Sequence, residues 1–146
     1  MPDDAVRNIF TVTRLTREIK SILEDQYPFI WITGEISNLS LPKSGHAYFT
    51  LKDQSAVISA VMFKNQKNAL KFSLESGLHI YGLARLTLYE PRGNYQLIFE
   101  HLEPEGAGSA QLAFEQLKTK LSAKGYFDPA AKKSIPFLSE RISVVT

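Results

Sequence analysis

Residues 45–63, GHAYFTLKDQSAVISAVMF, form the stretch that decides the fold. Read with a period of two, the stretch divides into two strands that are joined at residues 53–55. One face of this predicted hairpin is wholly apolar and carries Ala47, Phe49, Leu51, Ile58, Ala60 and Met62. The other face mixes aromatic, hydroxyl, basic and β-branched side chains, namely His46, Tyr48, Thr50, Lys52, Val57, Ser59, Val61 and Phe63. Such a hairpin can form half of a small barrel whose outer surface holds a ligand.

The composition is that of an ordinary globular chain. With 146 residues, 44% hydrophobic and 22% charged, we expect one domain, or one domain with pieces of a neighbour. No apolar run approaches the roughly 18 residues of a membrane span, and the acidic start at residues 1–4 predicts no secretory signal. The chain has no cysteine, which fits a reducing, cytoplasmic location. A net charge of +2 does not by itself indicate a nucleic-acid partner.

Five strands are predicted in the middle of the chain, within residues 29–37, 45–52, 56–63, 77–89 and 95–102, with a short helix within 64–72. Gly34 predicts a bend or a close backbone approach in the first strand. This order favours a mainly β fold with flanking helices, a five-stranded Greek-key OB-fold barrel preceded by one helix and followed by a helical linker. An SH3-like barrel or another small all-β fold remains an alternative. On an OB-fold, oligonucleotides lie across strands 2 and 3, beside the strand 1–2 and strand 4–5 loops.

Helices are predicted on both sides of the barrel. Thr13 resembles an N-cap for a helix over 14–24, with an apolar stripe for burial and a basic opposite face, and Trp31 is expected to pack under it. Residues 110–124 predict a second helix, and residues 142–146 predict the beginning of a strand that is cut off. We therefore divide the chain into an arm and helix (1–28), an OB-fold nucleic-acid-binding domain (29–103), and a linker helix with the truncated start of a further domain (104–146).

Motifs for catalysis are absent from the sequence pattern. His46, His79 and His101 fall on separate predicted strands, which does not suggest a metal site. The glycines of residues 106–111 lack the third glycine of a dinucleotide loop, and Glu18 and Lys20 diverge on a helix. We therefore predict no cofactor, no metal ligand and no catalytic residue in these 146 residues.

A binding surface is better supported than a catalytic one. Tyr48 and Phe63 lie on the outward face of adjacent predicted strands, where bases can stack on their rings. Basic side chains that can meet phosphates surround them. The candidate nucleic-acid-binding residues are His46, Tyr48, Lys52, Phe63, Lys64, Arg85 and Arg92. The alternative for the aromatic residues is packing on the barrel, and for Arg92 it is simple solvation.

Two blocks, SGHAYFTLKD at 44–53 and LYEPRGNYQ at 88–96, give the chain a specific resemblance. With WITGEISN at 31–38 and FEQLK at 114–118, it resembles the large subunit of exodeoxyribonuclease VII, a bacterial enzyme that degrades single-stranded DNA to oligonucleotides. The resemblance implies an N-terminal OB-fold that engages single-stranded DNA, a nuclease domain with the catalytic residues beyond Thr146, no strict need for a divalent metal, and a small subunit bound through missing C-terminal regions. Ser59 and Lys64 depart from the family pattern, where a basic residue and arginine are usual, and thin the positive charge of this face; Ser143, where glycine is usual, says nothing of function.

Three functional hypotheses follow. The first is the single-stranded-DNA-binding module of a two-subunit exonuclease. The second is a stand-alone protein that protects single strands, and the third is an OB-fold that mainly contacts other proteins. No membrane partner is expected under any of them.

Overall fold

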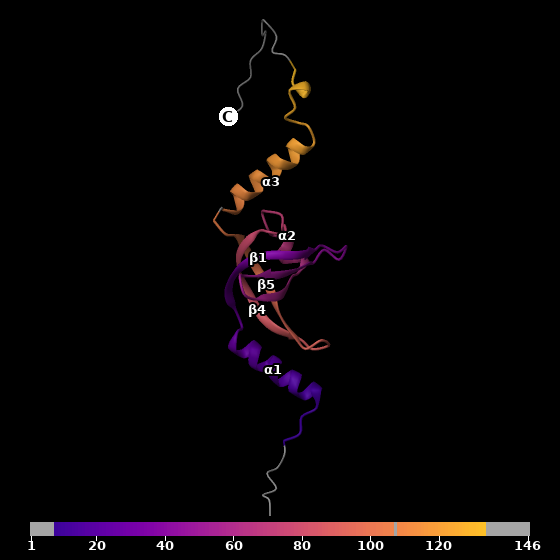
Figure 1. Cartoon of the computed structure of the whole chain (residues 1–146), viewed down its shortest axis with the longest axis vertical. Helices are drawn as coiled ribbons and strands as arrows, with labels where there is room; N and C mark the ends of the chain where they lie inside the picture. The colour runs from indigo at the N-terminus through magenta and orange to yellow at the C-terminus, as the bar shows by residue number, and fades with distance from the viewer. Residues whose placement is uncertain (1–7, 107, 134–146) are drawn as a thin grey trace, which may run out of the picture.

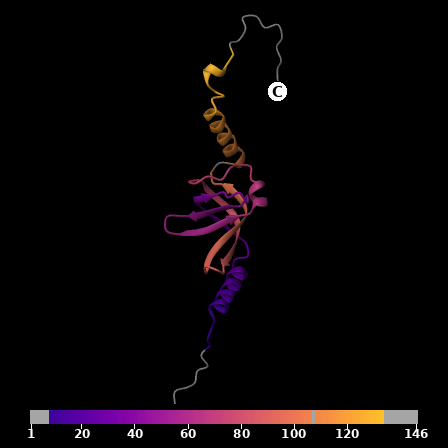
Figure 2. The same cartoon turned by 90° about the vertical axis from the view of Figure 1, so that its right-hand side faces the viewer.

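Five strands form a closed barrel in the order β1-β2-β3-β5-β4, as the Greek-key OB-fold prediction requires. The computed structural model describes residues 8–106 and 108–133. Figure 1 shows the barrel between two longer helices that extend from opposite ends, and Figure 2 shows the same arrangement from the side. The strands are β1 (Ile30–Ser40), β2 (Ala47–Lys52), β3 (Val57–Met62), β4 (His79–Tyr89) and β5 (Asn94–Pro104), and the helices are α1 (Val12–Gln26), α2 (Lys64–Asn68), α3 (Ser109–Ala123) and the 3-10 turn η1 (Pro129–Ala131).

The first strand is shared between two halves of the barrel. Its first half, from Ile30 to Glu35, pairs with β4, and its second half, from Glu35 to Ser40, pairs with β2. Gly34 lies where β1 changes partner, and a Cβ there would lie 2.8 Å from the Leu51 side chain and 2.8 Å from the Lys52 carbonyl oxygen. The close backbone approach predicted at Gly34 is therefore confirmed.

The apolar face of the 45–63 hairpin fills the barrel. Ala47, Phe49 and Leu51 alternate as buried residues with the more exposed members of β2, as the period of two predicts. Phe49 stacks on Phe99 of β5 with ring centroids 5.6 Å apart. Val61 departs from the expected alternation, because it is buried between Tyr48 and Ile98, its register partners on the neighbouring strands.

Helix α1 lies on the barrel with its polar side, which contradicts the expected burial of its apolar stripe. Thr11, rather than Thr13, is the N-cap, and its hydroxyl oxygen accepts a hydrogen bond from Arg14 N at 3.1 Å. The contacts to the barrel are polar: Thr87 donates to Glu24 at 2.6 Å, and Lys20 donates to Glu90 at 3.0 Å. Of the predicted apolar stripe, Leu15 (47% exposed), Ile19 (40%) and Ile22 (60%) face solvent, and only Leu23 is partly buried.

Trp31 is also placed differently from the prediction that it packs under α1. Ile30 and Ile32 point towards the core, so the alternation of β1 turns Trp31 outward, where it is 63% exposed. Its ring lies 6.1 Å from that of Tyr81 and 6.4 Å from that of His101, on the outer surface of β1, β4 and β5. It is therefore a surface aromatic residue on a part of the barrel that α1 does not cover.

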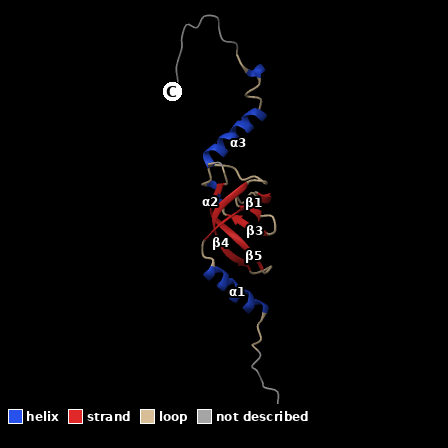
Figure 3. Cartoon of the chain, turned by 60° about the vertical axis from the view of Figure 1, so that its left-hand side comes forward, coloured by secondary structure: helices blue, strands red, loops and turns tan. Residues whose placement is uncertain are grey.

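Helix α3 leaves the barrel at the end opposite to α1, as Figure 3 shows. It lies within one residue of the predicted bounds at each end, and it is attached through Gln116, whose side chain accepts from Ser73 N and donates to Ser73 O, both at 2.9 Å. Phe114 and Leu117 of its apolar stripe are exposed. The strand predicted at 142–146 lies outside the described residues. Among the described helices, none combines the length and the apolar character that crossing a membrane requires.

Replacing Gly82 by alanine is expected to destabilise the barrel. The new Cβ would clash with the His101 carbonyl oxygen and lie 2.6 Å from Leu102 Cδ2, and backbone atoms cannot yield as a flexible side chain can. We expect Gly82→Ala to lower the free energy of unfolding by about 1–3 kcal/mol in urea titrations. Gly108→Ala is the control, since no atom lies within 4 Å of its Cβ position; an equal loss in both variants would contradict the packing argument.

The turn of the central hairpin is expected to make stability depend on pH. The Asp53 carboxylate accepts hydrogen bonds from the backbone N–H groups of Ser55 and Ala56, at 2.7 and 2.8 Å, and these hold its pKa below the ordinary 3.8. A lowered pKa means that the stabilisation is present above the ordinary value and is lost as the pH falls through the folded-state pKa. The stability difference between the wild type and Asp53→Ala should therefore be largest near neutral pH and shrink below 3.8. A difference that stays constant across this range in urea titrations would contradict the assignment.

Candidate nucleic-acid interface

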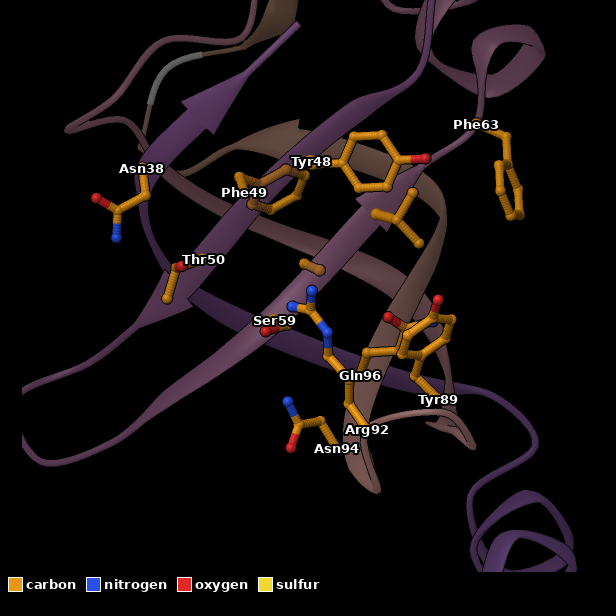
Figure 4. A pocket seen from close by; sticks show the side chains of 12 residues that line it. Asn38, Tyr48, Phe49, Thr50, Ser59, Phe63, Tyr89, Arg92, Asn94 and Gln96 are labelled. Carbon is orange, nitrogen blue, oxygen red and sulfur yellow. The ribbon is translucent and has the colours of Figure 1, made fainter. Parts of the chain in front are cut away.

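A groove of about 600 Å³ crosses the outer surface of β2 and β3 and reaches the turn between β4 and β5. Figure 4 shows its side chains, with Asn38 at one end, Phe63 at the other and Tyr48 between them. These are the strand 2–3 surface and the strand 4–5 turn that an OB-fold uses for oligonucleotides, with the end of β1 in place of the strand 1–2 loop. The groove is lined by Asn38, Tyr48, Phe49, Thr50, Ser59, Ala60, Val61, Phe63, Tyr89, Arg92, Asn94 and Gln96.

Aromatic rings are available at the surface of this groove. Tyr48 is 47% exposed and Phe63 is 40% exposed, so both rings offer surface to a ligand, and half-buried packing on the barrel stays the alternative to a binding role. Tyr89, also 47% exposed, is a third ring that the sequence reasoning missed. Its signal was present, because Tyr89 belongs to the same LYEPRGNYQ block as Arg92. Three aromatic side chains therefore line one surface.

His46 supports the aromatic surface from behind. Its ring meets the Phe63 ring edge-on at 5.4 Å and the Tyr48 ring edge-on at 6.4 Å. Its Nδ1 accepts a hydrogen bond from the backbone N–H of Lys64 at 3.0 Å, which requires that this nitrogen carry no proton. His46 is not among the residues that line the groove; it contacts Phe63 and the start of α2, and its role in nucleic-acid binding stays a prediction.

The predicted basic residues fall into two groups. Arg92 lines the groove and makes no ion pair within the described residues. Lys64 lies beside the groove, next to His46. By contrast, Lys52 pairs with Glu35 at 3.1 Å, and Arg85 pairs with Glu100 at 2.9 Å in a separate hollow of the barrel surface. The structure thus places Arg92 in the same groove as the aromatic rings. Lys52 and Arg85 are paired with carboxylates and do not line the groove, and the nucleic-acid-binding role of each predicted basic residue stays a prediction.

Acidic side chains are absent from the lining of the groove. Its polar members are hydroxyls and carboxamides, and Ser59 leaves the middle of the surface uncharged, as the sequence predicts. Glu90, in the adjacent turn, is bound by Lys20 at 3.0 Å and lies 3.8 Å from Arg17, and the hydrogen bond from Lys20 lowers the pKa of the Glu90 carboxyl. The basic side of α1 therefore neutralises the Glu90 carboxylate, which lies in the same turn as Arg92.

The groove can recognise a ligand without covalent chemistry. Its lining holds no histidine, cysteine or carboxylate that could serve as a general base or nucleophile. Within residues 8–106 and 108–133, no three acidic, histidine or cysteine side chains gather in a way that could hold a metal ion. What the lining offers is stacking on rings, hydrogen bonding to hydroxyls and carboxamides, and one guanidinium group. These are the contacts that single nucleic-acid strands use.

Comparison with known proteins defines the class. Residues 10–103 match the model of a family described as an OB-fold nucleic acid binding domain, and the chain belongs to this family. The chain is also similar to exodeoxyribonuclease 7 large subunits. It is 48% identical over 142 residues to that of Geotalea daltonii and 46% identical over 143 residues to that of Aliivibrio fischeri strain ES114, alignments that cover 97% and 98% of this chain. The resemblance inferred from the sequence is confirmed.

The similarity covers only part of the relatives. It includes 32% of the Geotalea and 32% of the Aliivibrio protein, so the chain spans about a third of the length of the curated relatives it matches.

Proposed function

We propose that the groove binds single-stranded DNA, as the DNA-binding module of an exodeoxyribonuclease VII large subunit. The observation that carries the proposal is the arrangement of Tyr48 and Phe63, exposed on one groove that lacks acidic side chains and contains Arg92. The names of the relatives, all exodeoxyribonuclease 7 large subunits, support a nuclease as the whole protein. An exodeoxyribonuclease acts on DNA, so DNA is the ligand to test first.

The chemistry of the groove favours single strands over duplexes. A base can lie flat on an exposed aromatic ring only after it has left its stack, and in a duplex that costs pairing and stacking energy. In a single strand the same contact contributes about 1–3 kcal/mol per base and tolerates any base. Arg92 adds a phosphate contact at the margin. The proposed module therefore binds single strands with little sequence preference.

The remaining parts of the proposal concern the whole protein. Residues 29–103 are the DNA-binding domain, and residues 104–146 lead through α3 into a nuclease domain that supplies the catalytic residues. The whole protein hydrolyses phosphodiester bonds in the cytoplasm and binds the small subunit through regions outside these 146 residues. The match to the OB-fold family, which ends at residue 103, supports the boundary after that residue, and the absence of cysteine fits the location.

Removing either ring is expected to weaken DNA binding. Phe63→Ala and Tyr48→Ala should each raise the Kd for a fluorescein-labelled oligo-dT by at least about fivefold, since one stacked base is worth about 1–3 kcal/mol. Fluorescence anisotropy measures the change, and thermal unfolding checks that each variant is folded. Trp31→Ala is the matched control, because Trp31 is 63% exposed on a different part of the barrel.

The two ring variants also separate the functional hypotheses. If Phe63→Ala and Tyr48→Ala bind like the wild type, or if the wild type binds duplex as tightly as single strands, the proposed site is wrong. Unchanged affinity in both variants would favour the hypothesis that the barrel mainly contacts protein.

Arg92 is expected to carry a phosphate contact that Arg85 does not. Each phosphate neutralised on a single strand contributes about 0.7 to the slope of log K against log salt. Arg92→Gln should therefore reduce the magnitude of this slope by about 0.7, whereas Arg85→Gln, which removes a side chain paired with Glu100 at 2.9 Å, should leave it unchanged. Anisotropy titrations at several salt concentrations give both slopes, and equal slopes for the two variants would contradict the placement.

A further inference from the structure

The end of β1 contains a β-bulge that changes which side chains face the groove. Ser37 pairs with Thr50 and Ser40 pairs with Tyr48, so Asn38 and Leu39 together lie opposite a single β2 residue, Phe49. Two residues opposite one is the signature of a bulge, which often re-aims a side chain beside a functional site.

The bulge inverts the alternation of β1. Gly34 and Ile36 are buried, and a regular strand would continue with Asn38 facing the core. Instead Leu39 packs against the core, and Asn38 is exposed and lines the groove. Asn38, which would face the core in a regular strand, thus faces the proposed DNA surface instead.

The backbone of Asn38 shows how the inversion is made. Its φ is +50°, in the left-handed region, and it is the only non-glycine residue with a positive φ within residues 8–106 and 108–133. Asparagine tolerates this region better than most residues, but glycine occupies it without a steric cost. The conformation by itself therefore does not require a side chain at position 38.

The carboxamide of Asn38 is available to a ligand. It makes no hydrogen bond within the described part of the chain, and in Figure 4 it stands at the end of the groove, on the strand beside Tyr48. In Figure 4 the Tyr48 ring extends towards the Phe63 end of the groove and Asn38 stands at the other end, so the base edge within reach of Asn38 belongs to a base held at that end. A carboxamide offers both a donor and an acceptor, as base edges do, whereas a phosphate offers acceptors only.

Building on the proposed function, we propose that Asn38 hydrogen-bonds the edge of a nucleobase held in the groove. The amide carries a donor and an acceptor, which exchange places when the carboxamide group turns by half a rotation. It can therefore form a hydrogen bond with the edge of any of the four bases. The contact therefore recognises the presence of a base without selecting its identity. Asn38 would make the groove distinguish a strand with unstacked bases from a bare polyanion.

The test compares Asn38→Gly with the wild type on two ligands of equal length and charge. One is oligo-dT, and the other is the same oligonucleotide with abasic sites in place of its central thymidines. The wild-type 146-residue chain should bind the abasic strand more weakly. Asn38→Gly should bind oligo-dT about three- to tenfold more weakly than the wild type, the usual worth of one hydrogen bond, and should bind the abasic strand as the wild type does.

Ser40→Gly is the matched control, since it introduces glycine at the other edge of the same bulge, at an exposed residue outside the groove lining. It should bind both ligands like the wild type. An Asn38→Gly variant that equals the wild type on oligo-dT would overturn the inference and leave Asn38 as a turn residue only. An equal loss on both ligands would also overturn it, because the contact would then be to the sugar–phosphate backbone or to the groove shape.

Failure of the proposed function would give a different result from failure of the Asn38 contact. If the wild type binds neither oligo-dT nor the abasic strand, the groove is not a DNA site, and the base contact falls with it. Binding of both strands by the wild type with the same affinity would retain a DNA surface but overturn the recognition of bases.

Discussion

The parallel pairing of β3 with β5, from Ser59 beside Gln96 to Met62 beside Phe99, closes the sheet into a barrel. Every other pairing in the barrel is antiparallel. This one pairing brings Gln96 beside Ser59, and with it the turn that carries Arg92, so that residues more than thirty positions apart share one groove. It also covers Phe99 and Met62, which are fully buried. The stability of the core and the shape of the binding surface thus rest on the same contact between strands.

Charge pairs decide how α1 meets the barrel. An apolar stripe normally packs against a core. Here Lys20 instead donates to Glu90 and Glu24 accepts from Thr87, and most of the apolar stripe of α1 is exposed to solvent. The consequence for the groove is electrostatic: Glu90 is occupied by α1, while Arg92, two residues later, has no carboxylate paired with it within the described residues. The basic face predicted for this helix is thus not simply solvated, because Lys20 and Arg17 contact Glu90 in the turn beside Arg92.

Local periodicity was enough to predict the barrel and several of the residues that line the groove. The hairpin at 45–63 alternates strictly, so the burial of Phe49 and the exposure of Tyr48 followed from a period of two. Gly34 was identified because glycine within an apolar strand indicates a bend or a close backbone approach, and the structure shows the close approach. These predictions succeed because they depend on residues adjacent in the chain.

Other features depend on distant partners and could not be predicted from local pattern. Lys52 and Arg85 are bound by Glu35 and Glu100, carboxylates that the fold brings to them from other strands. The inversion at Asn38 depends on the register in which β1 pairs with β2. The outward position of Trp31, by contrast, follows from local alternation with Ile30 and Ile32. Tyr89, the last residue of β4, joins the groove because β5 pairs with both β4 and β3.

The most direct test of the binding surface is the mapping of amide chemical shifts in ¹⁵N–¹H spectra while the chain is titrated with oligo-dT. We expect the largest changes at Tyr48, Ser59 and Arg92, along the groove, with changes that saturate together at one Kd. Residues on the outer surface of β1, β4 and β5, such as Trp31 and Tyr81, should be unaffected. Changes centred on Trp31 and Tyr81, with the groove unperturbed, would contradict the account.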